Sequence, residues 1–221
     1  MKEAFCEKEK QEFDYKSHWD SAYLKTKVNN LGWYEENPTP SLVLIEECNL
    51  PKNSLIFNAG AGASTLINEL LNRGYSNIIV NDISSTALTS LKGNLSHNDS
   101  SSEVKYIIDD LTNPIDLLKI KNVDVWHDRA VLHFFTEVSQ QNNYFQLIRN
   151  SVKSGGFVIL AEFNLNGAKK CSGLEVVNYD EKLLQEKLGN DFDLLKSFNY
   201  TYTQPSGSTR EYVYTLFKRK L

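Results

Sequence analysis

The stretch Ser54-Leu-Ile-Phe-Asn-Ala-Gly-Ala-Gly-Ala-Ser-Thr-Leu66 decides the fold of this chain. Its apolar first residues are typical of a buried strand, and they pass directly into a Gly-x-Gly turn. Gly60 and Gly62 lack Cβ atoms, so the backbone can turn sharply there and a ligand can lie close against it. A helix predicted over about 63–72 would point its free N–H groups back at that ligand. The stretch therefore predicts a strand, a ligand-binding turn and a helix in succession.

A second predicted strand, Ile78-Ile-Val-Asn-Asp82, ends in a carboxylate. Asp82 lies about 20 residues beyond the glycines, where nucleotide-binding folds place an acid on a ribose diol. Its alternative role is to cap a helix that begins at Ser84. The dinucleotide fingerprint requires a third glycine, and Thr65 stands at that position. A nicotinamide dehydrogenase is therefore a distant alternative.

Strands and helices alternate from Ser54 onward, which predicts a parallel sheet with helices on both faces. The third strand, Val104–Ile108, runs into Asp109-Asp110-Leu111, and the fourth, Val123–His127, runs into Asp128-Arg129. Right-handed crossovers would make this sheet doubly wound. Because such sheets bind ligands at the carboxyl ends of their strands, we expect these polar residues to converge on one cleft.

The C-terminal part departs from this alternation. A fifth strand, Phe157–Glu162, is followed by a helix and then by two extended runs, Phe192–Thr203 and Arg210–Lys218. A Pro/Gly turn separates the two runs, and this arrangement predicts an antiparallel hairpin.

The spacing Asn58-x-Gly60-x-Gly62-x-Ser64 resembles the first motif of the class I S-adenosylmethionine (SAM)-dependent methyltransferases, and Lys153-Ser-Gly-Gly156 is similar to their Gly-Gly turn. The resemblance implies an α/β, Rossmann-like, doubly wound sheet of seven strands, mostly parallel with one antiparallel edge strand. It also implies SAM as the cofactor and S-adenosylhomocysteine as its product. The methyltransferase domain would cover residues 39–221, after an aromatic-rich cap or lid over residues 1–38.

The resemblance assigns roles along the cofactor. Asp82 would hold the ribose, and Asp110 the adenine amino group, with Asp109 as the adjacent alternative. The residues implied in cofactor binding are Trp33, Asn58, Ala59, Gly60, Gly62, Ser64, Asp82, Ile83, Asp109, Asp110, Leu111 and His127. Asn58 departs from the family pattern, which has Asp or Glu there to hold the cationic end of SAM. Asn58 accepts hydrogen bonds but brings no charge, which predicts weaker cofactor affinity.

The segment after the fourth strand supplies the catalytic candidates His127, Asp128 and Arg129. His127 is a candidate general base, because an imidazole titrates near neutral pH, or else a strand-end histidine bonded to the backbone. Asp128 and Arg129 form either a substrate site or an internal ion pair. His133, within the apolar run Val131–Phe135, is a candidate substrate contact or a packing residue.

Aromatic clusters before Pro38 could cover the site and exclude water, which favours a reaction that disperses positive charge. The alternative for Trp33 and Tyr34 is plain core packing. Cys171, beside two lysines, is a candidate reactive thiol or simply a small loop residue. The full set of substrate-binding candidates is Trp19, Tyr34, Asp128, His133 and Cys171.

Two local patterns concern the methyl acceptor. Trp126-x-Asp128-Arg129-Ala and the loop Cys171–Tyr179 resemble the thiopurine S-methyltransferase type. An Asp followed by a basic residue after the fourth strand also resembles small lysine methyltransferases of translation factors. The resemblance thus implies in-line methyl transfer to a small-molecule nucleophile, with a sulfur atom favoured. The alternatives are a protein-lysine methyltransferase and a catalytically silent SAM-binding or interaction protein.

Composition sets further bounds. The chain has 221 residues, 41% of them apolar, and a formal net charge of −4. Its longest basic run is Lys218-Arg-Lys220, which argues against an extended nucleic-acid surface. The sequence has no apolar run of the roughly 20 residues of a membrane span and no signal-peptide pattern, so we expect a cytoplasmic location. We also expect a monomer or weak dimer. The three cysteines (Cys6, Cys48, Cys171) and four histidines show no metal-ligand spacing, and no metal is expected.

Overall fold

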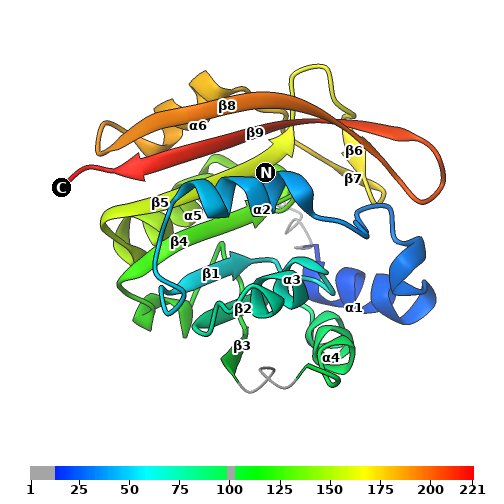
Figure 1. The fold of residues 1–221 in the computed structure, drawn as a ribbon. Helices are drawn as coiled ribbons and strands as arrows, with labels where there is room; N and C mark the ends of the chain where they lie inside the picture. The colour runs from blue at the N-terminus through cyan, green and yellow to red at the C-terminus, as the bar shows by residue number, and fades with distance from the viewer. Residues whose placement is uncertain (1–12, 99–102) are drawn as a thin grey trace, which may run out of the picture.

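A computed structural model describes residues 13–98 and 103–221. Cys6 and the first part of the predicted cap segment lie outside the described residues. Seven strands form one sheet in the order β3-β2-β1-β4-β5-β9-β8 (Figure 1). The strands are β1 (Ile56–Ala59), β2 (Ile78–Asp82), β3 (Val104–Ile108), β4 (Val123–Arg129), β5 (Val152–Phe163), β8 (Phe192–Thr203) and β9 (Thr209–Arg219).

The first five strands are parallel, and the chain changes direction across the sheet between β1 and β4. This arrangement confirms the predicted Rossmann-like, doubly wound sheet, and it places the ligand-binding switch point beside β1. The predicted hairpin is also confirmed as β8 and β9. Its first strand, β8, forms the edge, and the reversed strand β9 lies between β8 and β5 because it pairs antiparallel with both.

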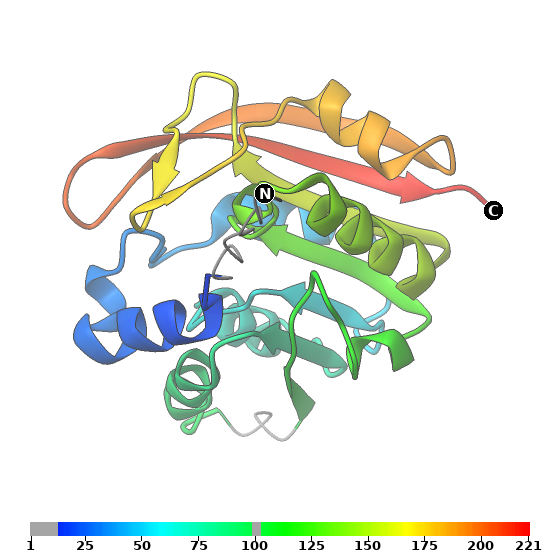
Figure 2. The same ribbon diagram turned by 180° about the vertical axis from the view of Figure 1, so that it is seen from behind.

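The helices cover both faces of the sheet, as Figures 1 and 2 show from opposite sides. One apolar core lies between the sheet and the helices α2 (Thr39–Glu47), α3 (Leu66–Asn72) and α4 (Ser85–Asn94). A second core lies against α5 (Val138–Ser151) and α6 (Glu181–Leu188). Side chains alternate between the two cores along a strand, so Ile56 packs on the α3 side and Phe57 on the α5 side. The strands therefore read as continuous apolar runs.

The described part of the cap segment contains α1 (Tyr15–Lys25) and a 3₁₀ turn, η1 (Val28–Asn30). Figures 1 and 2 both show α1 beside α4, near the carboxyl ends of the strands. Asp20 joins the two helices: its Oδ1 accepts hydrogen bonds from Ser84 Oγ at 2.7 Å and from Thr86 N at 3.1 Å. A carboxylate at the first turn of α4 also favours this docking, because the N-terminal end of a helix carries positive partial charge.

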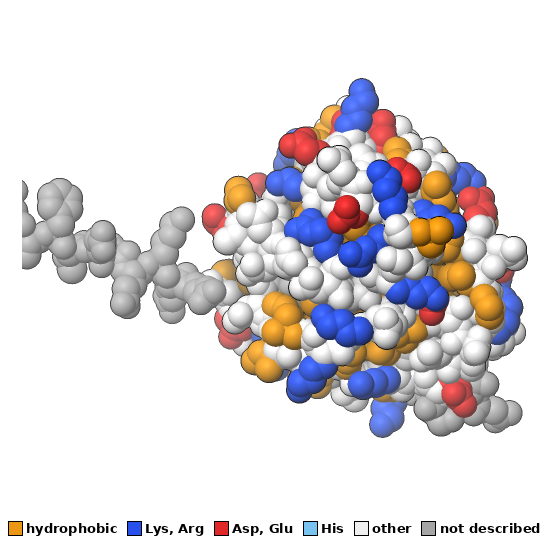
Figure 3. Space-filling view, turned by 90° about the vertical axis from the view of Figure 1, so that its left-hand side faces the viewer, with side chains coloured by type: hydrophobic (Ala, Val, Ile, Leu, Met, Phe, Trp, Pro, Cys, Tyr) orange, Lys and Arg blue, Asp and Glu red, His pale blue; other side chains and the backbone are white. Residues whose placement is uncertain are grey.

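Further short elements among the described residues are the 3₁₀ turns η3 (Leu117–Lys119) and η4 (Leu132–Phe134) and a hairpin of β6 (Lys170–Cys171) and β7 (Leu174–Glu175). The surface where the strands begin carries many Lys and Arg side chains with a few acidic ones among them (Figure 3). At that end of the sheet Lys220 pairs with Asp193 at 3.4 Å. None of the helices in the described ranges is long and apolar enough to cross a membrane.

Candidate cofactor and acceptor site

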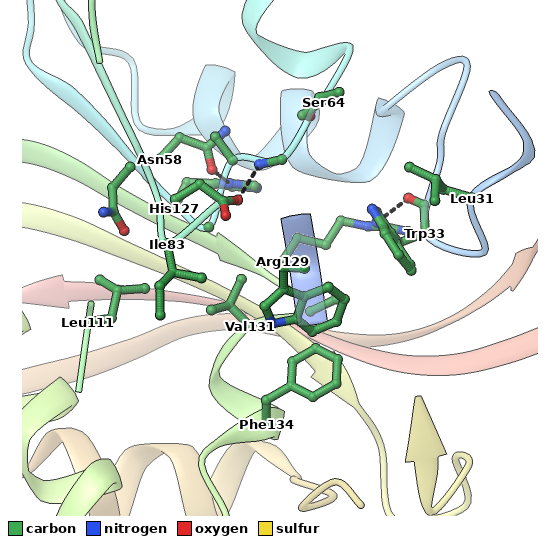
Figure 4. Close-up of a pocket in the computed structure, with 18 of the residues that line it drawn as sticks. Leu31, Trp33, Asn58, Ser64, Ile83, Leu111, His127, Arg129, Val131 and Phe134 are labelled. Carbon is green, nitrogen blue, oxygen red and sulfur yellow. Dashed lines mark hydrogen bonds between the residues drawn. The ribbon is translucent and has the colours of Figure 1, made fainter. Parts of the chain in front are cut away.

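A cavity opens at the carboxyl ends of the parallel strands, between the glycine turn and the cap (Figure 4). It brings together most residues that the sequence predicted for the site. The predicted residues that line it are Trp19, Trp33, Tyr34, Asn58, Gly60, Gly62, Ser64, Asp82, Ile83, Asp109, Asp110, Leu111, His127, Arg129 and Cys171. Ala59, Asp128 and His133 do not line it.

The glycine turn joins β1 to α3. Gly60 and Gly62 have φ angles of 52° and 56°, a region that residues with a Cβ rarely adopt. A Cβ added at Gly60 would lie 2.2 Å from Val131 Cγ2, and one at Gly62 would lie 2.2 Å from the Tyr23 hydroxyl. Both glycines are therefore required by the backbone conformation and by the space around them.

Asp82, at the end of β2, faces this turn. Gly62 N donates to its Oδ2 at 2.8 Å, and Ser84 N donates to its Oδ1 at 2.8 Å. Each oxygen keeps a second lone pair that can accept from a ligand hydroxyl. Burial raises the pKa of Asp82 to about 6. The N-cap of α4 is Ser84, whose hydroxyl oxygen accepts from Ala87 N. The capping role that the sequence left open for Asp82 therefore belongs to Ser84.

Two aspartates follow β3, and the structure distinguishes them. Asp109 Oδ2 accepts the three successive backbone N–H groups of residues 115–117 at 2.8–2.9 Å, so this carboxylate holds a turn. Asp110 uses Oδ1 for the backbone and hydroxyl of Thr112, both at 2.7 Å. The second oxygen of Asp110 receives no hydrogen bond from the described residues. Ile83 and Leu111 add apolar lining.

His127, on β4, is held at both ring nitrogens. Its Nδ1 lies 3.2 Å from Asn58 Oδ1, and its Nε2 lies 2.9 Å from Ser41 Oγ. Burial lowers the pKa of His127 to about 3, and the nearby charge of Arg129 acts in the same direction. The imidazole is therefore neutral, and it is engaged in orienting Asn58 beneath the cavity.

Arg129 connects the end of β4 to the cap. Its Nε lies 2.9 Å from Glu35 Oε2, and its Nη1 donates to the Trp33 carbonyl at 3.0 Å (Figure 4). The guanidinium carbon lies 4.9 Å and 5.0 Å from the ring centroids of Tyr202 and Tyr212. The sequence alternative of an ion pair between Arg129 and Asp128 is therefore wrong in its partner. Arg129 does form an ion pair, but with Glu35.

Asp128 and Ala59 point to the opposite side of the sheet, and His133 is buried outside the cavity. Asp128 follows His127 on the same strand, and alternation along β4 turns its carboxyl toward α5. There Tyr144 Oη donates to Asp128 at 2.5 Å, and His133 Nδ1 lies 3.0 Å from Glu162. Burial raises the pKa of both carboxyls, Asp128 and Glu162. Asp128 also accepts hydrogen bonds from the backbone N–H groups of Val131 and Leu132, so it fixes the turn that follows β4. Ala59 packs in the core on the α5 side.

The other end of the cavity is aromatic. Trp19 meets Phe134 edge-to-face with ring centroids 4.9 Å apart, and Trp19 and Trp33 meet in the same way at 5.5 Å. Tyr34 and Cys171 line the cavity with them. We call this region the acceptor end, and the region of the glycine turn, Asp82 and Asp110 the cofactor end.

Several lining residues were missed by sequence reasoning. The main ones are Tyr15, Tyr23, Leu31, Ser41, Val131 and Phe134. Tyr15, Trp19 and Tyr23 stand at intervals of four on one helix, and neighbours at this interval share a helix face. That spacing could have identified Tyr15 and Tyr23 from the sequence. Ser41 carries no such signal, because its role depends on how α2 packs against β4.

The described residues include no group of three or more His, Cys, Asp or Glu side chains placed to hold a metal ion. The cavity therefore offers hydrogen bonds, aromatic faces and apolar surface as its means of binding.

Comparisons with known proteins give a matching domain and similar folds. The family described as a methyltransferase domain matches residues 57–160, which run from within β1 to within β5. No curated protein matches the sequence. A SAM-dependent methyltransferase from Anabaena variabilis has a similar structure, with a TM-score of 0.72, 15% identity, and coverage of 95% of this chain and 96% of that chain.

Two further solved structures contain the cofactor or its product. The 1,6-didemethyltoxoflavin-N1-methyltransferase of Burkholderia thailandensis, with bound S-adenosylhomocysteine, has a TM-score of 0.66 at 14% identity over 83% of this chain and 78% of that chain. The magnesium protoporphyrin IX methyltransferase of Synechocystis, with bound SAM, has a TM-score of 0.61 at 17% identity over 82% of this chain and 77% of that chain. None of these matches confirms the thiopurine S-methyltransferase resemblance. The matched domain and the fold support a class I SAM-dependent methyltransferase with SAM as its cofactor.

Proposed function

We propose that this protein transfers the methyl group of SAM to a small, largely apolar nucleophile bound at the acceptor end. The observation that carries the proposal is the division of one cavity into two chemically different ends. The cofactor end presents a glycine turn and carboxylates with unused lone pairs, and the acceptor end presents aromatic rings.

The residues at the cofactor end fit an adenosyl ligand. Asp82 would accept hydrogen bonds from the ribose hydroxyls with the lone pairs that Gly62 and Ser84 leave unused. Asp110, rather than Asp109, would accept from the adenine amino group, because Asp109 is already committed to three backbone N–H groups. Ile83 would pack against the base.

When bound, SAM supplies a methyl group on a positively charged sulfur, which leaves without help from an acid. The remaining task of the protein is to align the acceptor with that methyl group at about 3–3.5 Å, and positioning of this kind provides much of a rate enhancement. The cap would perform it with Trp19, which packs on Phe134, and with Trp33, which packs on Trp19. The same cap would shield the reaction from water.

The site offers no ready general base. His127 is neutral but fixed at both ring nitrogens, and its pKa of about 3 makes it a weak proton acceptor. Burial raises the pKa of Tyr23, which makes deprotonation unfavourable. Acceptors that bring their own lone pair or anion, such as a thiolate, suit this site better than alcohols or ammonium groups.

A protein-lysine acceptor is less well supported. A lysine ammonium would need an acidic contact near the methyl group, and among the described residues at the acceptor end the acid is Glu35. Glu35 is already paired with Arg129 at 2.9 Å. One observation favours the other alternative, a silent SAM-binding protein: Asn58 gives the cationic end of SAM no charged partner.

A transfer assay with methyl-labelled SAM tests the proposal. The purified protein is incubated with small aromatic and aliphatic thiols, small amines, and lysine peptides, and labelled products are separated by chromatography. We expect label on a small apolar acceptor, with thiols ahead of amines at neutral pH. Label confined to lysine peptides would overturn the proposed acceptor, and tight SAM binding without transfer to any acceptor would favour the silent protein.

A further inference from the structure

Tyr23 projects from the cap onto the glycine turn. A Cβ added at Gly62 would lie 2.2 Å from its hydroxyl oxygen, so the hydroxyl stands directly over the part of the backbone that approaches the cofactor. Tyr23 lies eight positions after Tyr15 on the inner face of α1, and both side chains line the cavity. The sequence did not identify this tyrosine as a ligand contact.

The hydrogen bonds of this hydroxyl are incomplete. The Trp33 indole N–H donates to the Tyr23 oxygen at 2.9 Å. A phenol has one hydrogen to donate, and no described residue accepts it. The nearest carboxylate, Asp82, accepts from Gly62 and Ser84 and forms no hydrogen bond with Tyr23.

The hydroxyl keeps its hydrogen under all ordinary conditions. Burial raises the pKa of Tyr23 far above neutrality, and the negative charge of Asp82 raises it further. A hydroxyl that already accepts a hydrogen bond is also polarised toward donating, because hydrogen bonds in a chain strengthen one another. Tyr23 is thus a fixed donor that lacks an acceptor and lines the cavity at the glycine turn.

We propose that Tyr23 donates this hydrogen to the carboxylate at the amino-acid end of bound SAM, so that the cap itself recognises the cofactor. The inference rests on the proposed cofactor site. The carboxylate is the anionic group of SAM, and hydrogen bonds to an ionised acceptor are about twice as strong as neutral ones. Asp82 would hold the ribose on the other side of the turn.

Two adenosyl ligands separate this contact from the rest of the site. S-adenosylhomocysteine carries the carboxylate, whereas 5′-methylthioadenosine has the same nucleoside and thioether without the amino-acid end. Calorimetric titrations compare both ligands on wild type and on Tyr23→Phe. We expect the variant to bind S-adenosylhomocysteine roughly ten- to a hundredfold more weakly, the usual range for a lost hydrogen bond to a charged group. Its affinity for 5′-methylthioadenosine should stay within about twofold of wild type.

The control is Tyr200→Phe, the same change on β8 away from the cavity, which should affect neither ligand. Trp33→Phe removes one N–H that orients Tyr23, and it should give a smaller loss confined to S-adenosylhomocysteine; it tests the proposal even if Tyr23→Phe does not fold. Equal loss of both ligands, or no loss of either, in a folded Tyr23→Phe would overturn the proposal. Failure of wild type to bind either ligand would instead refute the proposed cofactor site.

Discussion

The two ends of the cavity are built in different ways. The cofactor end is built from backbone and short polar side chains that lie within about one turn of a strand end. The acceptor end is built from the cap, the residues after β4 and the β6–β7 hairpin, which meet through contacts between distant parts of the chain. Arg129 reaches the carbonyl of Trp33, 96 positions away, and Tyr202 reaches that of Tyr34, 168 positions away. The geometry of the cofactor end is therefore set by short stretches of sequence at the strand ends. The geometry of the acceptor end depends on tertiary packing between distant segments.

The largest effect should come from the backbone of the cofactor end. Gly60→Val would place side-chain atoms where Val131 lies, at a φ of 52° that valine does not tolerate. We expect no detectable S-adenosylhomocysteine binding by calorimetry. Gly74→Ala is the matched control, because Gly74 also has a positive φ, 83°, but open space around it. Binding by Gly60→Val at wild-type strength would show that the ligand lies elsewhere.

The next effect concerns the attachment of the acceptor end. Arg129→Met removes the cation that pairs with Glu35 and holds the Trp33 carbonyl. Loss of one partner of a buried ion pair costs about 3–5 kcal/mol of folding stability. We expect the free energy of unfolding to decrease by an amount near the lower end of this range, because protonation of Glu35 relieves part of the cost. Chemical denaturation measures it. The double variant Arg129→Met, Glu35→Gln should recover part of the lost stability. In Arg129→Met the KM for the acceptor should rise more than the dissociation constant of SAM. An unchanged free energy of unfolding in Arg129→Met would contradict the role of Arg129 in attaching the cap to the sheet.

The titration of Asp82 gives a pH signature to the cofactor end alone. Its pKa is raised to about 6 from an ordinary value of 3.8. The carboxylate form accepts the ribose hydroxyls, so S-adenosylhomocysteine affinity should fall as the pH drops through about 6, by at most tenfold per pH unit. Without ligand the raised pKa has the opposite effect on folding: its stabilisation is full below 3.8 and is lost as the pH rises through 6. Asp82→Asn should remove the pH dependence of both the ligand affinity and the folding stability. A pH dependence that persists in this variant would belong to another titrating group.

The smallest effect is expected where the chain departs from its family. Asn58→Asp would restore a charge beside the cationic end of SAM, and a charged acceptor adds about 1 kcal/mol over a neutral one. SAM binding should tighten several-fold, while 5′-methylthioadenosine, which lacks the ammonium group, serves as the insensitive comparator. Equal or weaker SAM binding would mean that the pairing of this position with His127 matters more than its charge.

The same contrast explains what the sequence could predict. The glycine turn, the acids at the end of β2 and after β3, and the alternation of strands and helices follow from short motifs, and the structure bears out the fold they implied. The residues after β4 were harder, because the motif identifies neighbours but not which face each one occupies. His127 and Arg129 line the cavity, whereas Asp128 between them turns into the core. Tyr23 and Ser41 gain their roles only when the cap and α2 pack against the sheet.

Calorimetric titration of the wild-type protein with S-adenosylhomocysteine, with NADH as the control nucleotide, tests the central claim most directly. The geometry of the glycine turn, Asp82 and Asp110 predicts micromolar binding of the adenosyl ligand and none of NADH. Absence of adenosyl binding, or preference for NADH, would contradict the assignment of the cavity as a SAM site.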